Sequence, residues 1–331
     1  MTKISPKKLQ SIFSKSKNKK IAIIGDVMVD KYVYGEINRV SPEAPVPVID
    51  VKKIEYKLGG AANVANNVKA LGSEPILIGL IGDDLDGKHF LQTMKSLKLN
   101  VSGIVNDKTR PTTTKTRVIA HSQHVIRIDD EKKKDVSGDA EKKVLDFVRK
   151  NISSFEAVIL QDYNKGILSK KMINGVIALC KKNNKPVYVD PKFDNFFEYK
   201  GVNVFKPNKK EIQDVLGMKV DDDESAAKAG KKLLEKLECE YLVLTRGEKG
   251  MMLFDKENGK AVALNIPTKA RNVADVSGAG DTVISTIAVT LAGGAGIEEA
   301  IVLANHAAGI VCEEVGIVPI YRKALINSFA E

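Results

Sequence analysis

A glycine-rich segment, DVSGAGD at residues 275–281, carries the strongest chemical signal in the sequence, and an apolar stretch follows it directly. Gly278, Ala279 and Gly280 are small, so their backbone N–H groups can approach a ligand closely. At the start of a helix such groups form a hole for phosphate oxygens. Asp281, in the first helical turn, would then accept a proton from an attacking hydroxyl group. The pattern predicts phosphoryl transfer to an alcohol. The alternative is an ordinary helix start with the preceding serine as its N-cap.

Two earlier segments suit a ligand that is rich in hydroxyl groups. In LGGAANV, Gly59 and Gly60 precede a helix whose first polar residue is Asn63, so backbone N–H groups and a carboxamide would be exposed together. In GDVMVD, Asp30 follows the first expected strand, where a carboxylate can accept two hydroxyl hydrogen bonds. The GxGxxG pattern of a dinucleotide site is absent there, which counts against a nicotinamide-dependent dehydrogenase. The structural alternatives are a loop-to-helix transition for the glycines and a turn for Asp30.

Two later segments offer groups for a nucleotide. In KPNKKEI, Asn208 and Glu211 could reach Mg2+ and its waters, because this ion takes oxygen ligands. The alternative is that Asn208 only caps the following helix. In TRGEKG, Thr245, Gly247 and Gly250 lie at the end of an expected strand. They would either approach the nucleotide phosphates or form a simple turn.

Composition and charge narrow the classes of function. The chain has 331 residues, 43% of them apolar and 28% charged, and its formal net charge is +10. The excess lysine is scattered along expected helices and tryptophan is absent, so we expect no nucleic-acid binding. No segment approaches the roughly 18 apolar residues that span a bilayer. The basic first 20 residues lack the apolar core of a secretory signal and predict a solvated helix. Three separated cysteines indicate neither disulfides nor zinc. We therefore expect a cytoplasmic protein with no membrane partner.

Apolar runs that indicate strands alternate with helical periodicity along most of the chain. The expected strands are 21–25, 75–82, 157–162, 186–190, 202–206 and 241–245, and the expected helices include 61–71, 85–97, 169–182 and 282–292. Continuous apolar strands separated by helices predict an α/β fold with a doubly wound, mainly parallel sheet. Two stretches, at about 32–58 and 112–129, alternate charged residues with β-formers and predict a small β lid. No linker separates domains, so residues 1–331 are expected to form one domain.

These segments, in this order, resemble the ribokinase-like (PfkB) family of carbohydrate kinases over nearly the whole chain. The early GGxxN motif and the late GAGD motif are jointly very specific for that family. The resemblance implies ATP and Mg2+ as cofactors, and it suggests a monovalent-cation site. It also implies these roles: Asp281 as the catalytic base; Gly278, Ala279 and Gly280 as the anion hole; Asn208, Lys209, Lys210 and Glu211 as nucleotide-binding residues; Asn305 near the nucleotide base; and Asp30, Gly59, Gly60 and Asn63 as sugar-binding residues.

Within the family, the chain is most similar to the D-glycero-β-D-manno-heptose-7-phosphate kinases, the kinase part of the ADP-heptose synthesis protein. The similarity rests on GDVMVDKYVYG, NRVSPEAPVPV, LQDYNKG, VDPK and KPNKKE, of which SPEAPVPV at 41–48 is the most distinctive. It implies transfer of the ATP γ-phosphoryl group to the C1 hydroxyl of this heptose phosphate, on the route to lipopolysaccharide core, by a homodimer joined through its lids. Gln161 and Ser277 depart from the family's usual small residue and threonine. The sequence contains no HxGH nucleotidyltransferase motif, so we expect a separate adenylyltransferase to act downstream.

Two other functions stay open at this point. One is a kinase of the same fold that acts on another sugar, sugar phosphate or nucleoside. The other is a non-catalytic sugar sensor, which the intact Asp281 argues against.

The arginines of the expected lid bear on how a substrate phosphate would be recognised. The chain has only eight arginines, and four of them, Arg39, Arg110, Arg117 and Arg127, lie in the lid or its approach. A dianionic phosphate favours the planar, multi-donor guanidinium group. Lys115 and Arg117 are two residues apart in a strand-like segment and therefore share a face. We hypothesise that Arg117 or Arg127 contacts the phosphate, from its own or the partner's lid. The alternative is that these residues form lid salt bridges, for example with Asp129.

Overall fold

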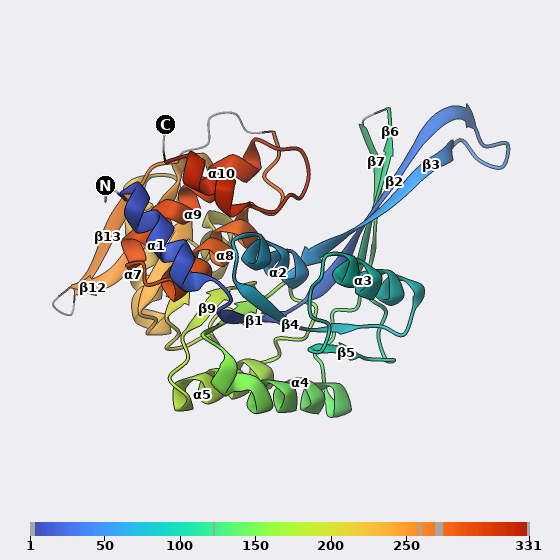
Figure 1. Ribbon diagram of the computed structural model, residues 1–331. Coiled ribbons are helices and arrows are strands. Elements are labelled where there is room, and N and C mark those ends of the chain that lie inside the picture. The colour runs from blue at the N-terminus through green and yellow to red at the C-terminus, as the bar shows by residue number, and fades with distance from the viewer. Residues whose placement is uncertain (1–3, 122, 258–259, 269–273, 330–331) are drawn as a thin grey trace.

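The computed structural model describes residues 4–121, 123–257, 260–268 and 274–329 (Figure 1). Within these residues a large sheet carries helices on both faces, and a smaller sheet projects from one side as a lid. The prediction of an α/β fold with a doubly wound, mainly parallel sheet and a β lid is confirmed. No helix in the described part of the chain is long and apolar enough to cross a bilayer.

The strands of the large sheet lie in an order that brings distant parts of the sequence together. Across the sheet the described strands are β13 (Lys260–Ile266), β12 (Met251–Glu257), β11 (Tyr241–Thr245), β10 (Val204–Phe205), β9 (Val187–Asp190), β8 (Ala157–Gln161), β1 (Lys20–Gly25), β4 (Glu74–Ile81) and β5 (Ile104–Asn106). Neighbours from β11 to β5 are parallel, and β12 and β13 add an antiparallel edge. The carboxyl ends of the parallel strands therefore meet at one edge of the sheet.

The helices cover both faces of this sheet. In chain order they are α1 (Pro6–Ser16), α2 (Ala61–Ala70), α3 (Leu85–Ser96), α4 (Gly138–Asn151), α5 (Lys170–Lys182), α6 (Lys209–Leu216), α7 (Asp223–Leu237), α8 (Ala279–Ala292), α9 (Ile297–Cys312) and α10 (Arg322–Asn327), with 3-10 turns at Ile152–Ser154 and Gly247–Lys249. The predicted helices agree with these bounds to within three residues.

Alternate residues of the central strand β1 enter two separate hydrophobic cores. Ile21 and Ile23 join the core that includes α2, α8 and α9, whereas Ala22 and Ile24 join the core that includes α4, α5 and α7. Because side chains alternate across a strand, a strand covered on both faces must be apolar throughout. This explains why the core strands could be recognised as continuous apolar runs. The expected strand 202–206 is shorter in the structure, where β10 spans only Val204–Phe205, and at its amino end the Asn203 side chain accepts the Val187 N–H at 2.9 Å.

The first helix departs from the prediction of a solvated leader. In α1 the residues Leu9, Ile12 and Phe13 are fully or almost fully buried, and the helix contacts α8 and α10. Ile12 is three residues and Phe13 four residues after Leu9, so all three lie on one face of the helix. The basic residues occupy the opposite face. The lysine-rich composition of this segment hid an amphipathic helix that belongs to the core.

The lid is a four-stranded sheet whose roots lie deeper in the body than the sequence predicted. Its strands, in spatial order, are β3 (Pro47–Gly60), β2 (Val27–Val40), β6 (Thr114–Ala120) and β7 (Gln123–Asp130). Only Asp26 separates β1 from β2, and β3 runs directly into α2. The predicted bounds of 32–58 were therefore too narrow on their body side, whereas those of 112–129 agree with β6 and β7 to within two residues. The turn alternative for Asp30 is wrong because Asp30 lies within β2. The turn expected near Ser122 lies outside the described residues.

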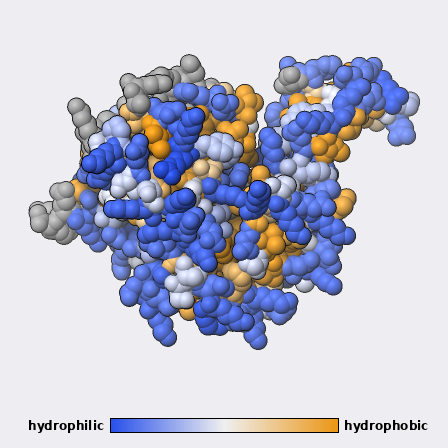
Figure 2. All heavy atoms as spheres, viewed as in Figure 1, coloured by the Kyte–Doolittle hydropathy of each residue, from blue (hydrophilic) through white to orange (hydrophobic). Residues whose placement is uncertain are grey.

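The two faces of the lid differ in chemistry. Register pairs Asp30 with Lys57 on one side and with Lys115 on the other, and it pairs Tyr32 with Arg117, so one face is charged. The opposite face carries branched apolar residues, and three of them, Ile54, Ile126 and Ile128, are 46%, 54% and 53% exposed. Figure 2 shows hydrophobic residues among the charged ones on the visible side of the lid.

Candidate active site

A cavity of about 830 Å³ opens at the carboxyl ends of the parallel strands, beside the N-terminus of α8. This is the edge at which open α/β sheets bind ligands. The cavity lining includes eleven residues that the sequence singled out: Asn208, Lys209, Lys210, Thr245, Gly247, Gly250, Gly278, Ala279, Gly280, Asp281 and Asn305. Segments that are up to 97 positions apart in the chain are thus brought together around one space. The Asn305 amide donates to the Pro267 carbonyl at 2.6 Å on the wall of this cavity.

The N-terminus of α8 has no side-chain cap. Gly278 is the N-cap, with a φ of 82°, a conformation that L side chains rarely adopt. The alternative in which Ser277 caps the helix is wrong. The Ser277 N–H instead donates to Asp275 at 2.8 Å. A helix start that opens into a cavity without a capping side chain suits an anion, because backbone donors and the helix dipole both point at it.

Asp281 lies in the first turn of α8 and is buried behind this helix start. Its carboxylate accepts hydrogen bonds from Asn63 Nδ2 at 2.8 Å, from the Tyr163 hydroxyl at 2.7 Å and from Gln161 Nε2 at 3.1 Å. Burial raises the pKa of Asp281 to about 6, although the bonds from Asn63 and Tyr163 oppose this rise. A carboxylate with a pKa in this range can both hold and release a proton near neutral pH.

A buried ion pair lies next to the same helix start. Lys206 Nζ is 2.9 Å from Asp190 Oδ1, and the two side chains are 3% and 10% exposed. Both groups lie close to Gly280, since a β-carbon placed on that glycine would stand 3.6 Å from Lys206 Nζ and 3.7 Å from Asp190 Oδ2. Neither residue was predicted to lie in the site. Only their positions in the sequence could have indicated a role. Asp190 in VDPK is the last residue of β9, and Lys206 in KPN directly follows β10.

The residues expected near Mg2+ are engaged in capping α6. The Asn208 side chain accepts the Glu211 N–H at 2.9 Å, and the Glu211 carboxylate accepts the Asn208 N–H at 2.8 Å and pairs with Lys192. The capping alternative is therefore confirmed. A role near Mg2+ and its waters stays a prediction, because capping uses only one lone pair on each of these oxygens. The described residues contain no group of three or more histidine, cysteine or acidic side chains arranged to hold one.

The expected sugar-binding residues lie where the lid joins the body. A β-carbon on Gly59 would clash with the Asp30 carboxylate, and one on Gly60, which has a φ of 59°, would clash with the Asp26 carbonyl. Close approach of the chains therefore explains both glycines. Asn63 is bonded to Asp281, and Asp30 is ion-paired with Arg117.

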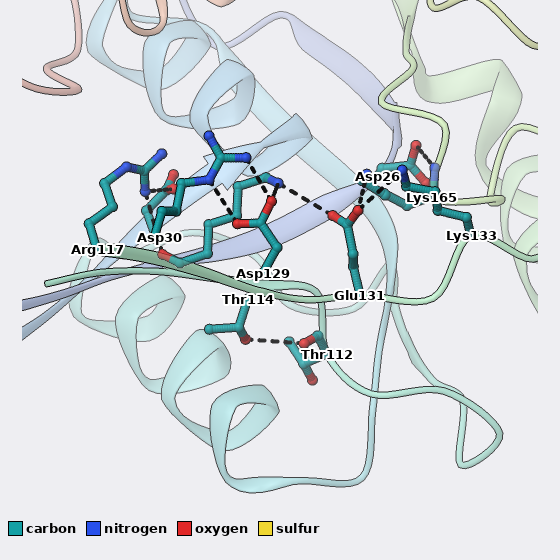
Figure 3. Close-up of polar contacts among 11 residues, drawn as sticks. Asp26, Asp30, Thr112, Thr114, Arg117, Asp129, Glu131, Lys133 and Lys165 are labelled. Atoms are coloured by element: carbon teal, nitrogen blue, oxygen red, sulfur yellow. Dashed lines mark hydrogen bonds and ion pairs between the residues drawn. The ribbon is translucent and has the colours of Figure 1, made fainter. Parts of the chain in front are cut away.

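The lid cations differ in how fully they are engaged. Figure 3 shows Arg117 reaching Asp30, with Asp129 and Glu131 beside them. Lys115 contacts the carboxylates of Asp129 and Glu131 at 3.2 and 3.3 Å. The distances between charged groups for the remaining lid arginines are 2.6 Å for Arg127 with Asp129, 3.0 Å for Arg110 with Asp107 and 3.9 Å for Arg39 with Asp50. The salt bridge expected between Arg127 and Asp129 is thus present.

Lys57 was missed by the sequence analysis. It lies opposite Asp30 on the charged face of the lid, and its ammonium group is 5.1 Å from the centre of the Tyr32 ring. Among the described residues it forms no ion pair. It projects toward the loop around Gly316, since a β-carbon there would be 3.9 Å from its Nζ. It is therefore a half-buried cation that faces the body, and its nearest acidic neighbour on the same strand, Glu55, interacts with it without an ion-pair contact.

Asp26 organises the loop that carries Tyr163. Its buried carboxylate accepts the N–H groups of Tyr163, Lys165 and Ile167 at 2.9, 3.0 and 3.2 Å. Burial raises the pKa of Asp26, and these three bonds oppose the rise. The loop after β8 is thereby held so that the Tyr163 hydroxyl meets Asp281. The carboxylate was visible in the sequence only as part of the GD pair after the first strand.

Comparisons with known proteins agree with this architecture. The family described as pfkB family carbohydrate kinase matches residues 18–322. The bifunctional protein HldE of Geobacter sulfurreducens is 40% identical over 322 residues, which are 97% of this chain and 65% of that protein. HldE of Helicobacter pylori is 42% identical over 298 residues, 90% of this chain and 64% of that protein. The chain therefore spans slightly less than two thirds of the length of these relatives.

Solved structures share the fold at low sequence identity. Phosphofructokinase-2 from Escherichia coli in complex with potassium superimposes with a TM-score of 0.76 at 15% identity, covering 95% of this chain and 98% of that one. Arabidopsis thaliana ribokinase complexed with ribose and ATP gives a TM-score of 0.73 at 21% identity, covering 95% and 99%. The family match covers almost the entire length of this chain. The chain therefore belongs to the pfkB family of carbohydrate kinases, phosphotransferases that act on sugar hydroxyl groups with ATP.

Proposed function

We propose that this kinase phosphorylates the C1 hydroxyl of D-glycero-β-D-manno-heptose 7-phosphate to the 1,7-bisphosphate, in the synthesis of ADP-heptose. The observation that carries the chemistry is the buried Asp281 carboxylate at an uncapped helix N-terminus, inside the cavity at the strand ends. Support for the substrate comes from the SPEAPVPV segment at 41–48 and from about 40% identity to HldE proteins over almost the whole chain. The separate adenylyltransferase and the cytoplasmic location stay predictions.

In this proposal Asp281 accepts the proton of the C1 hydroxyl as its oxygen attacks the γ-phosphorus of ATP. The backbone N–H groups of Gly278, Ala279 and Gly280, with the ammonium group of Lys206, stabilise the negative charge on the transferring phosphoryl group. Lys209, Lys210 and Asn305 line the part of the cavity assigned to the nucleotide. Mg2+ that arrives with ATP would neutralise phosphate charge, and a monovalent cation stays a prediction.

The assignment of the base predicts a large effect of a small change. Asp281→Asn keeps the size of the side chain but cannot take up the proton, so kcat should fall by at least about two orders of magnitude. ATP binding, measured by calorimetry with a non-hydrolysable analogue, should be retained. For the parent enzyme kcat should rise with pH through about 6, the pKa of Asp281, because only the deprotonated carboxylate is active.

The matched control is Asp139→Asn, which removes a carboxylate that is 76% exposed at the start of α4 and distant from the cavity. This variant should retain the parent kcat. An Asp281→Asn enzyme that is close to normal in kcat would show that another group is the base.

The proposed substrate predicts one product. In a coupled ADP-release assay against a panel of sugar phosphates, free sugars and nucleosides, heptose 7-phosphate should give the highest kcat/KM. The products should be ADP and a bisphosphate, with neither pyrophosphate nor ADP-sugar formed by this chain. A higher kcat/KM for fructose phosphate, ribose or a nucleoside would favour another kinase of this family. ADP-heptose formed by the purified chain would disprove the single activity.

We assign the substrate's distal phosphate to the charged face of the lid, and specifically to Lys57 and Arg117. Lys57 faces the body without an ion pair among the described residues, and Arg117 is adjacent on the same face. Lys115 and Arg127 are neutralised by Asp129 and Glu131 and are less suited to the role. Since Arg117 already pairs with Asp30, the phosphate would share or replace that contact.

Removal of these charges should affect the phosphosugar and not ATP. Lys57→Met and Arg117→Ala should each raise the KM for the phosphosugar about tenfold or more, with the KM for ATP almost unchanged. Arg39→Ala, which removes a lid arginine that is 68% exposed, is the control and should have no effect. Arg127→Ala should have a smaller effect than Arg117→Ala. If none of these variants reduces the preference for the phosphorylated over the free heptose, the phosphate is bound elsewhere.

We further propose that the enzyme is a homodimer joined through the apolar faces of its lids. Exposed Ile54, Ile126 and Ile128 on one sheet face form a surface that a second copy of the lid could cover. Sedimentation velocity should give twice the chain mass, and Ile126→Glu should shift the species toward monomer. Leu264→Glu, at a 41% exposed position on β13, is the control. A parent chain that sediments as a monomer at assay concentration would refute the dimer.

A further inference from the structure

Gln161, the last residue of β8, connects two carboxylates in the candidate site. Its Nε2 is 3.1 Å from Asp281 Oδ1 and also 3.1 Å from Asp190 Oδ2. The side chain is 1% exposed. The amide group thus donates one hydrogen to the carboxylate in the first turn of α8 and the other to the carboxylate at the end of β9.

The orientation of this amide is determined by its neighbours. Reversing it would place Oε1 against two carboxylates, where like partial charges repel. In the observed orientation Oε1 is buried and has no hydrogen-bond partner among the described residues. A buried polar atom without a partner is unfavourable. The two donations from Nε2 offset this cost.

The amide is one link in a continuous polar chain. Lys206 pairs with Asp190, Asp190 accepts from Gln161, and Gln161 donates to Asp281. The cation beside the helix start is thereby connected to the proposed base through groups that are all buried. Without the amide, two carboxylates would face each other in a medium of low dielectric constant, where like charges repel strongly.

Asp281 faces other polar and charged groups besides Gln161. Titratable or charged groups come from the loop after β8, from β9 and from the end of β10, and they are Tyr163, Asp190 and Lys206. Asn63 of α2 is neutral. Burial raises the pKa of Tyr163 well above its usual value, so its hydroxyl stays protonated and continues to donate at the pH values of an assay. Among the described residues bonded to Asp281, only Gln161 also bonds to Asp190.

We propose that Gln161 is a positioning residue that bridges Asp281 and Asp190 and keeps Asp281 in its proton-accepting form. This inference rests on the proposed role of Asp281 as the base. The amide hydrogen bond favours the charged form of Asp281, and the second donation holds the Asp190 carboxylate toward Lys206.

The test is the pH dependence of kcat, measured with saturating Mg-ATP and the sugar phosphate that the substrate panel identifies. Gln161→Met keeps the length of the side chain and removes both donors. Its acidic limb should lie about one pH unit higher than that of the parent enzyme, because a lost hydrogen bond to a carboxylate makes proton release harder. Gln161→Glu places a third carboxyl group at the bridge and should shift the limb further in the same direction.

A control variant separates this effect from loss of an amide-to-carboxylate hydrogen bond in general. Asn203 also donates from its amide to a carboxylate, Glu240, at 2.8 Å, but at the opposite, amino-terminal edge of the sheet. Asn203→Met should leave the limb at the parent pH. The thermal midpoint and ATP binding of each variant establish that it is folded.

The results distinguish failure of the Gln161 bridge from failure of Asp281 as the base. An acidic limb that is unchanged in Gln161→Met and in Gln161→Glu would overturn the bridge, even if kcat falls, since loss of packing alone does not move a limb. If Gln161→Met does not fold, Gln161→Glu decides alone, and an unchanged or lower limb overturns the proposal. An active Asp281→Asn enzyme would instead disprove the base itself.

Discussion

Burial of the Asp281 carboxylate is the constraint on which the site depends. A carboxylate without water is strongly disfavoured unless donors replace its hydration. Here three donors arrive from three separate elements: Asn63 from α2, Gln161 from β8 and Tyr163 from the loop beyond it. The large sheet must place β8 beside β1 for this to happen, and α2 must cross in front of α8. Packing and chemistry are therefore coupled, because a displacement of any of these elements would leave a buried charge without a partner.

The same constraint explains why the glycines cluster at the root of the lid. Gly59 gives the Asp30 carboxylate room, and Gly60 lets the chain turn against the carbonyl of Asp26 into α2. A larger residue at either position would clash with Asp30 or Asp26 at the point where the lid leads into α2 and Asn63. The glycines that looked in the sequence like a ligand-binding loop thus act also through backbone geometry close to the base.

Much of the fold could be predicted because it rests on local patterns. Continuous apolar runs identified the strands, and the GAGD segment identified the helix start with its aspartate. What could not be predicted depends on which strand ends become neighbours. Lys206, Asp190 and Gln161 are far apart in the sequence, and only the order β10–β9–β8 brings them together. The burial of α1 was missed because polar and charged residues outnumber apolar ones in this helix, although the spacing of Leu9, Ile12 and Phe13 was visible. Lys57 could not be recognised from its residue type, because its position opposite Asp30 follows from the register of β3 with β2.

Asp26 has a consequence for mechanics as well as for chemistry. It is the single residue between β1 and β2, and its carbonyl oxygen accepts the N–H of Ala61, where β3 passes into α2, at 3.0 Å. Both roots of the first lid hairpin are thus fastened to one residue, whose carboxylate also grips the loop of Tyr163. Asp26 therefore connects the base of the lid to the loop that carries Tyr163. A swing of the lid over a bound sugar would be transmitted through this point to the hydroxyl that touches the base, so occupancy under the lid and the readiness of Asp281 would change together.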